Sequence, residues 1–241
     1  MEQITLSNIE LYSTDRKNVQ DNHLKIDGDD VHHISKVMRH KKDDEIYVTD
    51  GNGSIYLVNI SEIGKDEIEA AIIKTFNFKN NFQNITVCIP ILKSHERLEY
   101  ALEKCTELGI TNYFIYEAKR STPKGIKLKR WEKLVLAAMK QSLRSYLPSI
   151  KELKSLSLLN DLPGIKIVFD QNSGNSFVEF IKEMKSIENE NIYLVFGPEG
   201  GLSEEELNSI DEKEFYRLTN NRLRSETAIA AAVAVLTTSL S

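Results

Sequence analysis

A strand, a glycine-rich loop and a helix follow one another near the end of the chain. Ile192–Phe196 is an apolar, β-branched and aromatic run, and the loop Gly197–Gly201, with the sequence GPEGG, ends it. Glycine permits positive φ and lets the backbone approach a ligand, while proline fixes its own φ. Ser203 with Glu206 three residues later is a capping-box pattern, which predicts a new helix. Such a loop binds ligands at the carboxyl end of a buried strand in many open α/β sheets, and it can equally be a plain turn before a well-capped helix.

The loop matches neither of the common phosphate-binding patterns. A P-loop needs Lys-Ser/Thr after its last glycine, and a dinucleotide-binding loop needs a third glycine at the helix start and an acid on the next strand. Neither pattern is present, and Glu199 and the glutamates at 204–206 would repel a phosphate. We therefore expect a neutral or cationic ligand.

Residues 1–75 contain short β-like runs. Glu45–Thr49 and Ser54–Ile60 flank the hairpin signal at 50–53, and Glu67–Lys74 is typical of another strand. Asp29-Asp30 is expected to cap a short helix. The apolar positions that this helix should turn inward are Val31, Ile34, Val37 and Met38.

From Ile85 onward strands alternate with helices, which predicts βαβ units and a largely parallel sheet. The expected strands are Ile85–Leu92, Asn112–Glu117, Ile165–Asp170, Ile192–Phe196 and Phe215–Leu218. The expected helices are Ser94–Leu108, one that turns Leu128, Trp131, Leu134, Val135 and Ala138 inward, Phe177–Met184, and one capped by Ser225 that continues through Ala228–Leu240. We predict a small β-rich domain at 1–75, a linker at 76–84 and an α/β domain at 85–241.

The composition favours a soluble cytoplasmic protein. The chain has 241 residues, of which 41% are hydrophobic, and from its pattern we expect neither a signal peptide nor an apolar run that could span a membrane. Cys88 and Cys105 lie in apolar runs and are expected to be reduced core residues. His32-His33 has no Cys or His partner at ligand spacing, so no metal site is expected.

The charge is unevenly distributed, although the net charge is −5. The balance is −6 over residues 1–75, +8 over 76–154 and −7 over 155–241, and the basic excess is densest between Lys119 and Arg144. A basic patch can hold a polyanion on an acidic protein, and it can also be an ordinary solvated helix face. Lys93, Arg97 and Lys104 are placed by the pattern where they could contact a phosphate backbone.

Several motifs together resemble one family. Phe-Gly-Pro-Glu-Gly-Gly-Leu-Ser at 196–203 and Leu-Arg-Ser-Glu-Thr-Ala at 223–228 resemble the SPOUT class of methyltransferases, specifically the RsmE family of 16S ribosomal RNA (uracil-N3)-methyltransferases. The resemblance extends over nearly the whole chain. It includes His32-His33 with 36–39, the segment Glu103–Ile110, and the pairs Arg120-Ser121, Arg130-Trp131 and Gln141-Ser142 through Pro148.

The resemblance implies a PUA-like RNA-binding β-barrel followed by an α/β SPOUT methyltransferase domain with a C-terminal trefoil knot. It implies S-adenosyl-L-methionine as the cofactor, a homodimer, and 16S rRNA in the small ribosomal subunit as the substrate. A sulfonium cofactor carries no phosphate and tolerates the nearby Glu199. The cofactor-binding residues that the family motifs assign are Phe196, Gly197, Pro198, Glu199, Gly200, Gly201, Leu218, Thr219, Asn220 and Leu223.

The chemistry requires removal of the proton that uracil N3 carries at neutral pH. A base or a cation that stabilises the uracil anion is therefore expected. Arg224 is the candidate cation, and Glu199 or Glu226 is the candidate proton acceptor. Helix-dipole stabilisation by Glu226 and a salt bridge by Arg224 are the structural alternatives.

The residues expected to contact RNA are His33, Arg39, Lys93, Arg97, Lys104, Arg120, Lys129, Arg130, Lys133 and Arg144. The chain departs from the family in three places that concern RNA. Its first arginine is Arg16 rather than one beside the initiator methionine, and it has Lys119 and Lys140 where the family commonly has glutamate. The alternatives are a related SPOUT enzyme that modifies a tRNA or a ribose 2′-hydroxyl, and a non-catalytic RNA-binding protein of the same fold.

Overall fold

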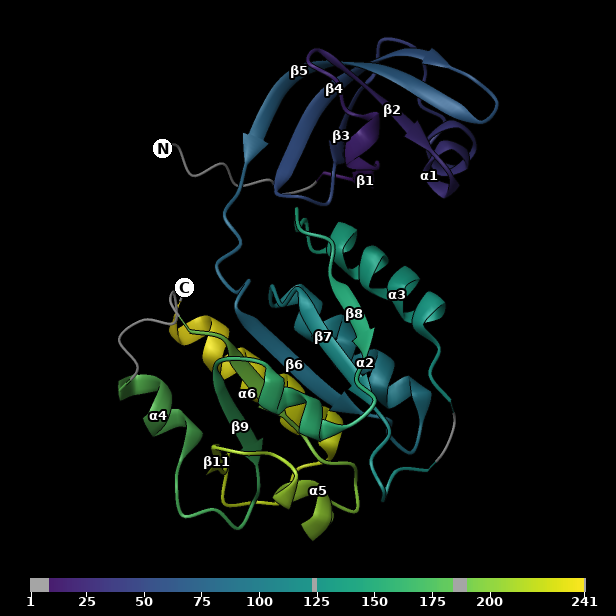
Figure 1. The fold of residues 1–241 in the computed structure, drawn as a ribbon. Helices are drawn as coiled ribbons and strands as arrows, with labels where there is room; N and C mark the ends of the chain where they lie inside the picture. Colours follow the sequence, from purple (N-terminus) through teal and green to yellow (C-terminus); the bar gives the residue numbers. More distant parts are fainter. Residues whose placement is uncertain (1–8, 123–124, 184–189, 241) are drawn as a thin grey trace. The chain divides into compact units, whose positions relative to one another are not determined.

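The computed structural model describes residues 9–122, 125–183 and 190–240 and divides the chain into two compact units. One unit is formed by the chain up to Asn80 together with Met139–Leu147, and the other by Asn81–Ala138 together with the chain from Pro148 onward (Figure 1). In the described part of the chain, no helix has both the length and the apolar character that a bilayer crossing requires.

The first unit contains a curved five-stranded sheet in the order β1-β3-β4-β5-β2. Its strands are β1 (Leu11–Ser13), β2 (His23–Asp27), β3 (Glu45–Thr49), β4 (Ser54–Ile63) and β5 (Glu67–Asn77). The β3–β4 hairpin is confirmed, and β5 runs past its predicted end because Phe76 pairs with Ile55 and is buried. At the two edges of the sheet, the hydroxyl of Thr14, the residue after β1, donates to the carbonyl of Lys25 in β2.

The short helix of the first unit differs from its prediction. It begins as α1 (Asp29–His32) after Gly28 and continues as a π-helical turn, η2 (His33–Val37). Val31 and Ile34 are buried as expected, but 54% of Val37 and 46% of Met38 are exposed. The prediction of an inward-facing Val37 and Met38 was wrong because the π turn adds a residue and rotates the following positions away from the core.

The segment Met139–Leu147 packs into the first unit, which the sequence did not predict. The amide of Gly53 donates to Ser145 O at 2.9 Å, and the amide of Leu147 donates to Gly51 O at 2.8 Å. Gly53 has φ of 102°, and a Cβ there would lie 2.4 Å from the Tyr146 hydroxyl, so glycine is required. Lys140 Nζ also lies 2.6 Å from Asp30 Oδ1, a buried carboxylate.

The second unit is built on a six-stranded sheet in which every recorded pair is parallel, as predicted. The order is β11-β9-β10-β6-β7-β8. The strands are β6 (Ile85–Pro90), β7 (Asn112–Tyr116), β8 (Ser149–Glu152), β9 (Ile165–Phe169), β10 (Ile192–Val195) and β11 (Lys213–Tyr216). The sequence missed β8 and placed β11 two residues too late.

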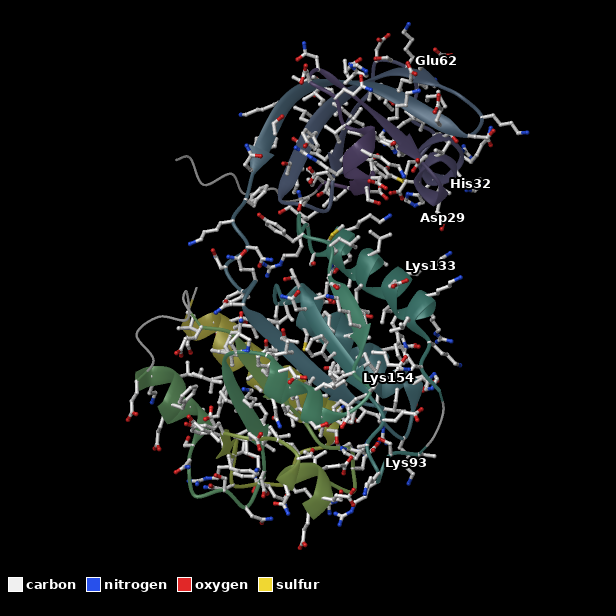
Figure 2. The ribbon with its side chains drawn as sticks, in the orientation of Figure 1. Asp29, His32, Glu62, Lys93, Lys133 and Lys154 are labelled. Carbon is white, nitrogen blue, oxygen red and sulfur yellow. The ribbon has the colours of Figure 1, made fainter. Side chains whose placement is uncertain are left out.

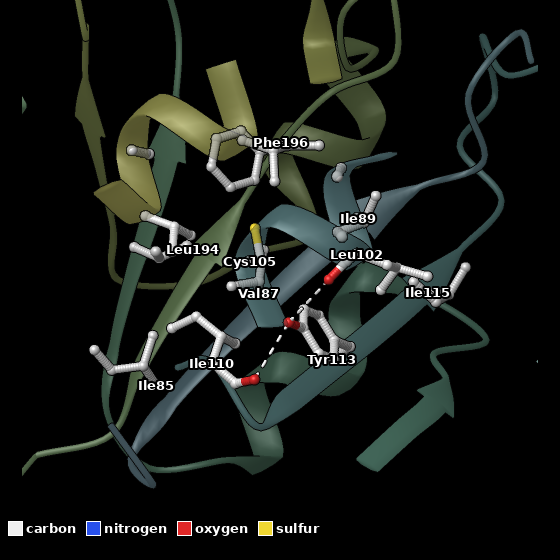
Figure 3. Packing of buried hydrophobic residues seen from close by; sticks show 14 of the residues in the cluster. Ile85, Val87, Ile89, Leu102, Cys105, Ile110, Tyr113, Ile115, Leu194 and Phe196 are labelled. Carbon is white, nitrogen blue, oxygen red and sulfur yellow. Dashed lines mark hydrogen bonds between the residues drawn. The ribbon is translucent and has the colours of Figure 1, made fainter. Parts of the chain in front are cut away.

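Alternate side chains of the strands enter two separate cores, as period-2 geometry requires. One face packs against α2 (His95–Glu107), α3 (Leu128–Gln141), α4 (Phe177–Glu183) and α6 (Ser225–Ser239). Figure 3 shows this core, in which the Tyr113 hydroxyl donates to Ile110 O at 3.3 Å. The other face packs against η3 (Leu156–Asp161) and α5 (Glu204–Asn208).

Most helix predictions are confirmed. Trp131 is fully buried in the core, and Cys88 and Cys105 are free and buried, so burial raises the pKa of both thiols. The α4 prediction ended at Met184, which lies outside the described residues. The prediction that Ser225 caps α6 was wrong: Ser225 is the first helical residue, and Arg224 occupies the cap position without a side-chain hydrogen bond.

Candidate active site

A cavity of about 800 Å³ lies in the second unit, where the loops after β9, β10 and β11 come together. All but one of the predicted cofactor residues line it: Phe196, Gly197, Pro198, Glu199, Gly200, Gly201, Leu218, Thr219 and Leu223. Asn220 is absent from the lining, whereas Arg222 and Arg224 belong to it. The glycine loop (Gly197–Gly201) and the arginine loop (Leu218–Arg224) therefore meet at one site, although they are well separated in the sequence.

A third loop lines the cavity, and the sequence reasoning missed it. The strands before the two loops, β10 and β11, are not neighbours in the sheet, because β9 lies between them. Asp170, Gln171 and Asn172, directly after β9, therefore face the same cavity. A polar triplet at the carboxyl end of a predicted parallel strand was the available signal.

The loop Gly197–Gly201 is held in one shape by its own hydrogen bonds and by the strand before it. The Gly201 amide donates to Pro198 O at 2.8 Å, and Gly201 has φ of 70°. Phe196 stacks on Phe169 with ring centroids 4.5 Å apart, and its carbonyl accepts the buried Tyr116 hydroxyl. The side chain of Phe196 thus belongs to the core.

The capping box that follows the loop is confirmed. The Glu206 amide donates to Ser203 Oγ at 3.2 Å, and the Ser203 amide donates to Glu206 Oε2 at 2.8 Å. The Lys119 amide donates to Glu206 Oε1 at 2.8 Å. Burial raises the pKa of Glu206, but the hydrogen bonds that its carboxylate accepts from Ser203 and Lys119 outweigh burial, so the pKa is lowered overall. The cap therefore fixes both the end of the loop and the start of α5.

Glu199 connects the loop to the segment after β6 and to α2. Its carboxylate accepts the Lys93 amide at 3.2 Å and the Arg97 Nη1 donor at 3.2 Å. Arg97 Nε also lies 3.5 Å from Glu226 Oε1. One guanidinium thus joins α2, the glycine loop and the first turn of α6.

The two candidate proton acceptors occupy different positions around this guanidinium. Glu199 lines the cavity, whereas Glu226 is absent from its lining and is only 9% exposed. Glu226 Oε2 has no hydrogen-bond partner among the described residues. Arg97 was expected to contact an RNA phosphate, but the structure places it in the cavity wall between two carboxylates.

The other residues predicted to contact RNA have different surroundings in the structure. Lys104 is neutralised by Glu103 and Glu107 at 2.7 and 2.8 Å, which raises its pKa, and Arg130 pairs with Glu99 at 2.7 Å. Arg120 donates to Gly200 O at 2.9 Å and lines the cavity. Arg39, Lys93, Lys129, Lys133 and Arg144 are exposed, as are Arg120 and Arg130, and Figure 2 labels Lys93 and Lys133. His33 is half-buried, and its Nδ1 lies 3.4 Å from Glu10.

Substitution Arg97→Ala tests the connection to Glu226. It should lower the free energy of unfolding by about 1–2 kcal/mol, because a buried carboxylate loses its cation in a site that solvent partly reaches. Urea denaturation measures the loss. In a Glu226→Gln background the same substitution should have a smaller effect, since a neutral amide needs no counter-charge. Equal losses in both backgrounds would show that Arg97 and Glu226 are not coupled.

Comparison with known proteins assigns both units. Residues 79–237 match the RNA methyltransferase domain family, and residues 26–73 match the RNA methyltransferase PUA domain family. Ribosomal RNA small subunit methyltransferase E of Aquifex aeolicus is 30% identical over 208 residues, which cover 83% of this chain and 88% of that protein. The chain belongs to the ribosomal RNA small subunit methyltransferase E family. The Bacillus subtilis member is 28% identical over 226 residues and covers 88% of each chain.

A solved structure of the same family shares the fold. The Ribosomal RNA small subunit methyltransferase E from Neisseria gonorrhoeae, whose structure has S-adenosyl methionine bound, superposes with a TM-score of 0.83. It is 24% identical and covers 96% of this chain and 98% of that one. Membership of the family makes this chain an α/β RNA methyltransferase with an N-terminal PUA-like domain.

Proposed function

We propose that this chain transfers the methyl group of S-adenosylmethionine to N3 of a uridine in 16S rRNA, within the assembled small ribosomal subunit. The observation that carries the proposal is the cavity in the second unit, where the glycine loop, the arginine loop and a carboxylate converge. Family membership supports both the substrate class and the cofactor.

The cavity fits S-adenosylmethionine. Its volume of about 800 Å³ lies in the range of small-molecule sites. A Cβ at Gly197 would stand 3.1 Å from Leu202 N, so a side chain would force the loop to shift, and glycine lets backbone groups form the cavity wall. We assign cofactor binding to Phe196–Gly201, Leu218, Thr219 and Leu223, mainly through backbone groups. When bound, the cofactor supplies an electrophilic methyl group.

The chain's own residues then prepare the uracil. Arg224 lines the cavity and is exposed, so its guanidinium can face the uracil anion and stabilise the charge that develops on loss of the N3 proton. Glu199 is the proton acceptor in this proposal because it lines the cavity and Glu226 does not. Glu226 acts through Arg97, which orients Glu199. The loops hold the acceptor atom in line with the methyl group, chiefly by positioning.

Several finer features belong to the same proposal. We assign residues 1–75 to an RNA-binding PUA-like barrel, 76–84 to a linker and 85–241 to the methyltransferase domain. The C-terminal part is proposed to form the trefoil knot of the SPOUT class, and two copies to form a homodimer in the cytoplasm, where ribosomes are assembled. The small and apolar residues of α6 suit close packing against a second helix.

RNA binding by the basic stretch is testable through its salt dependence. Replacing Lys129, Arg130 and Lys133 with Ala should weaken binding to small ribosomal subunits and reduce the slope of log K against log salt by about one for each lost phosphate contact. Filter binding over a series of salt concentrations measures both. Lys182→Ala, in α4, is the control and should leave the slope unchanged. An unchanged slope in the triple variant would make the stretch an ordinary solvated face.

Titration calorimetry with S-adenosylmethionine tests the cofactor site directly. The intact chain should bind with a saturable heat and one equivalent per chain. Absence of heat over the micromolar to millimolar range would remove the cavity from consideration as the cofactor site.

A further inference from the structure

Two apolar side chains next to each other in the first unit are left uncovered by the fold. Val37 is 54% exposed and Met38 is 46% exposed. They are the only large hydrophobic residues in the described part of the chain that are both adjacent in sequence and exposed to this degree. They belong to the segment 36–39 that carries the family resemblance, and no role in the fold accounts for them.

The turn that carries the pair is held by hydrogen bonds. The Met38 amide donates to His33 O at 2.9 Å, and the His40 amide donates to Ile34 O at 3.0 Å. The Ser35 hydroxyl donates to Val31 O at 2.7 Å. These hydrogen bonds hold the backbone of the π turn in place, so the side chains of Val37 and Met38 stay exposed to solvent. Figure 2 labels Asp29 and His32 on the helix that leads into this turn.

Arg39, the next residue, has an unfavourable backbone conformation. Its φ is 60°, in the left-handed region that favours glycine. Glycine would occupy this position without strain, so a test that replaces Arg39 can use glycine. Arg39 is exposed beside the apolar pair.

Three cations lie close to the pair in the sequence. Lys36, Arg39 and Lys42 are exposed, and within the described residues none of them takes part in an ion pair. Two nearby carboxylates are already engaged: Asp30 accepts Lys140 at 2.6 Å, and Asp44 accepts the Lys41 amide at 2.8 Å. The surface therefore presents a small apolar contact flanked by unpaired positive charge, which is complementary to a polyanion that carries apolar faces.

We propose that Val37 and Met38 pack against an unpaired base of the RNA while Lys36, Arg39 and Lys42 contact the neighbouring phosphates. This inference rests on the proposed RNA substrate. A paired A-form helix hides its base faces, so an apolar contact of this kind selects an unstacked base in a loop, bulge or single strand. Methionine suits the contact because its flexible thioether adapts to an aromatic face.

The test compares two kinds of variant on two RNAs. The probes are a single-stranded oligoribonucleotide and a fully paired duplex of the same composition. Val37→Ser with Met38→Ser should weaken binding to the single strand about 5- to 20-fold with an unchanged salt slope, because no charge is lost. Binding to the duplex should change less than twofold. Ile73→Ser, in β5 and 52% exposed, is the matched control and should leave both affinities unchanged.

Variants of the cations should behave in the opposite way. Lys36→Gln with Lys42→Gln should reduce the salt slope on both RNAs. Arg39→Gly should weaken binding about 3- to 10-fold while the melting temperature stays the same or rises, because glycine relieves the left-handed strain.

Each outcome decides the proposal. Unchanged single-strand affinity in the Val37→Ser, Met38→Ser variant, with a wild-type chain that binds RNA, overturns this inference and leaves the proposed function standing. A wild-type chain that binds neither RNA nor small subunits overturns both. Loss of self-association without loss of RNA affinity in the double variant would assign the pair to a protein contact and overturn the inference as well.

Discussion

Gly197→Arg is expected to abolish binding of S-adenosylmethionine, with a loss of at least about 100-fold in affinity. A Cβ at this position would lie 3.1 Å from Leu202 N and 3.2 Å from Gly201 Cα, both backbone atoms of the same loop. The loop would have to shift, and the rest of the side chain would enter the cavity or push the loop out of shape. Titration calorimetry measures the loss.

The matched control is Gly174→Arg. Gly174 is an exposed loop glycine of the same unit outside the cavity lining, and a Cβ there meets no atom within 4 Å. This variant should bind the cofactor as the wild type does. Both variants should remain folded by circular dichroism, since the loop follows the end of β10 and leaves the strand core intact. Normal titration heat from Gly197→Arg would contradict the assignment of the site.

Arg224→Ala is expected to lower kcat about 10²- to 10³-fold while the affinity for S-adenosylmethionine changes less than threefold. The proposed role of the guanidinium appears only when negative charge develops on the uracil, so its loss should affect the transition state rather than cofactor binding. Arg224 makes no side-chain cap hydrogen bond at α6, so alanine should disturb the helix little. Single-turnover methyl transfer with saturating cofactor measures the step.

Two controls separate this role from general loss of positive charge. Arg222→Ala removes a cation from the same loop and should reduce kcat less than fivefold. The defect of Arg224→Ala should also shrink as the pH rises, because uracil N3 then loses its proton in solution without help. A defect that is equal in both variants, or independent of pH, would contradict the role of Arg224.

Local patterns predicted the parts of the fold that depend on neighbouring residues. The capping box at Ser203 and Glu206, the burial of Trp131 and the β3–β4 hairpin each follow from the chemistry of a few adjacent positions. The convergence of the loops after β10 and β11 also followed, because the family resemblance assigned both loops to one cofactor site.

Long-range order could not be read in the same way. That β9 lies between β10 and β11 is a property of the whole sheet, and it adds Asp170–Asn172 to the cavity. Arg97 meets Glu199, 102 residues later, and Glu226, so its pairing could not be inferred from helix spacing. Its position on the helix was compatible with RNA contact, and only the fold shows two carboxylates around it.

The outward rotation of Val37 and Met38 has a local cause that the apolar spacing conceals. Positions 31, 34, 37 and 38 fit an ideal α-helical stripe, but the π turn His33–Val37, which contains both Ile34 and Val37, changes the angular spacing along it. Hydrophobic periodicity assumes regular helix geometry and fails where the helix changes type.

The measurement that tests the central claim most directly is the transfer of labelled methyl from S-adenosylmethionine to small ribosomal subunits that lack the modification, followed by digestion and nucleoside analysis. The account predicts label in 3-methyluridine, with little transfer by the Arg224→Ala variant. Label in another nucleoside, or no label from a chain that binds the cofactor normally, would contradict it.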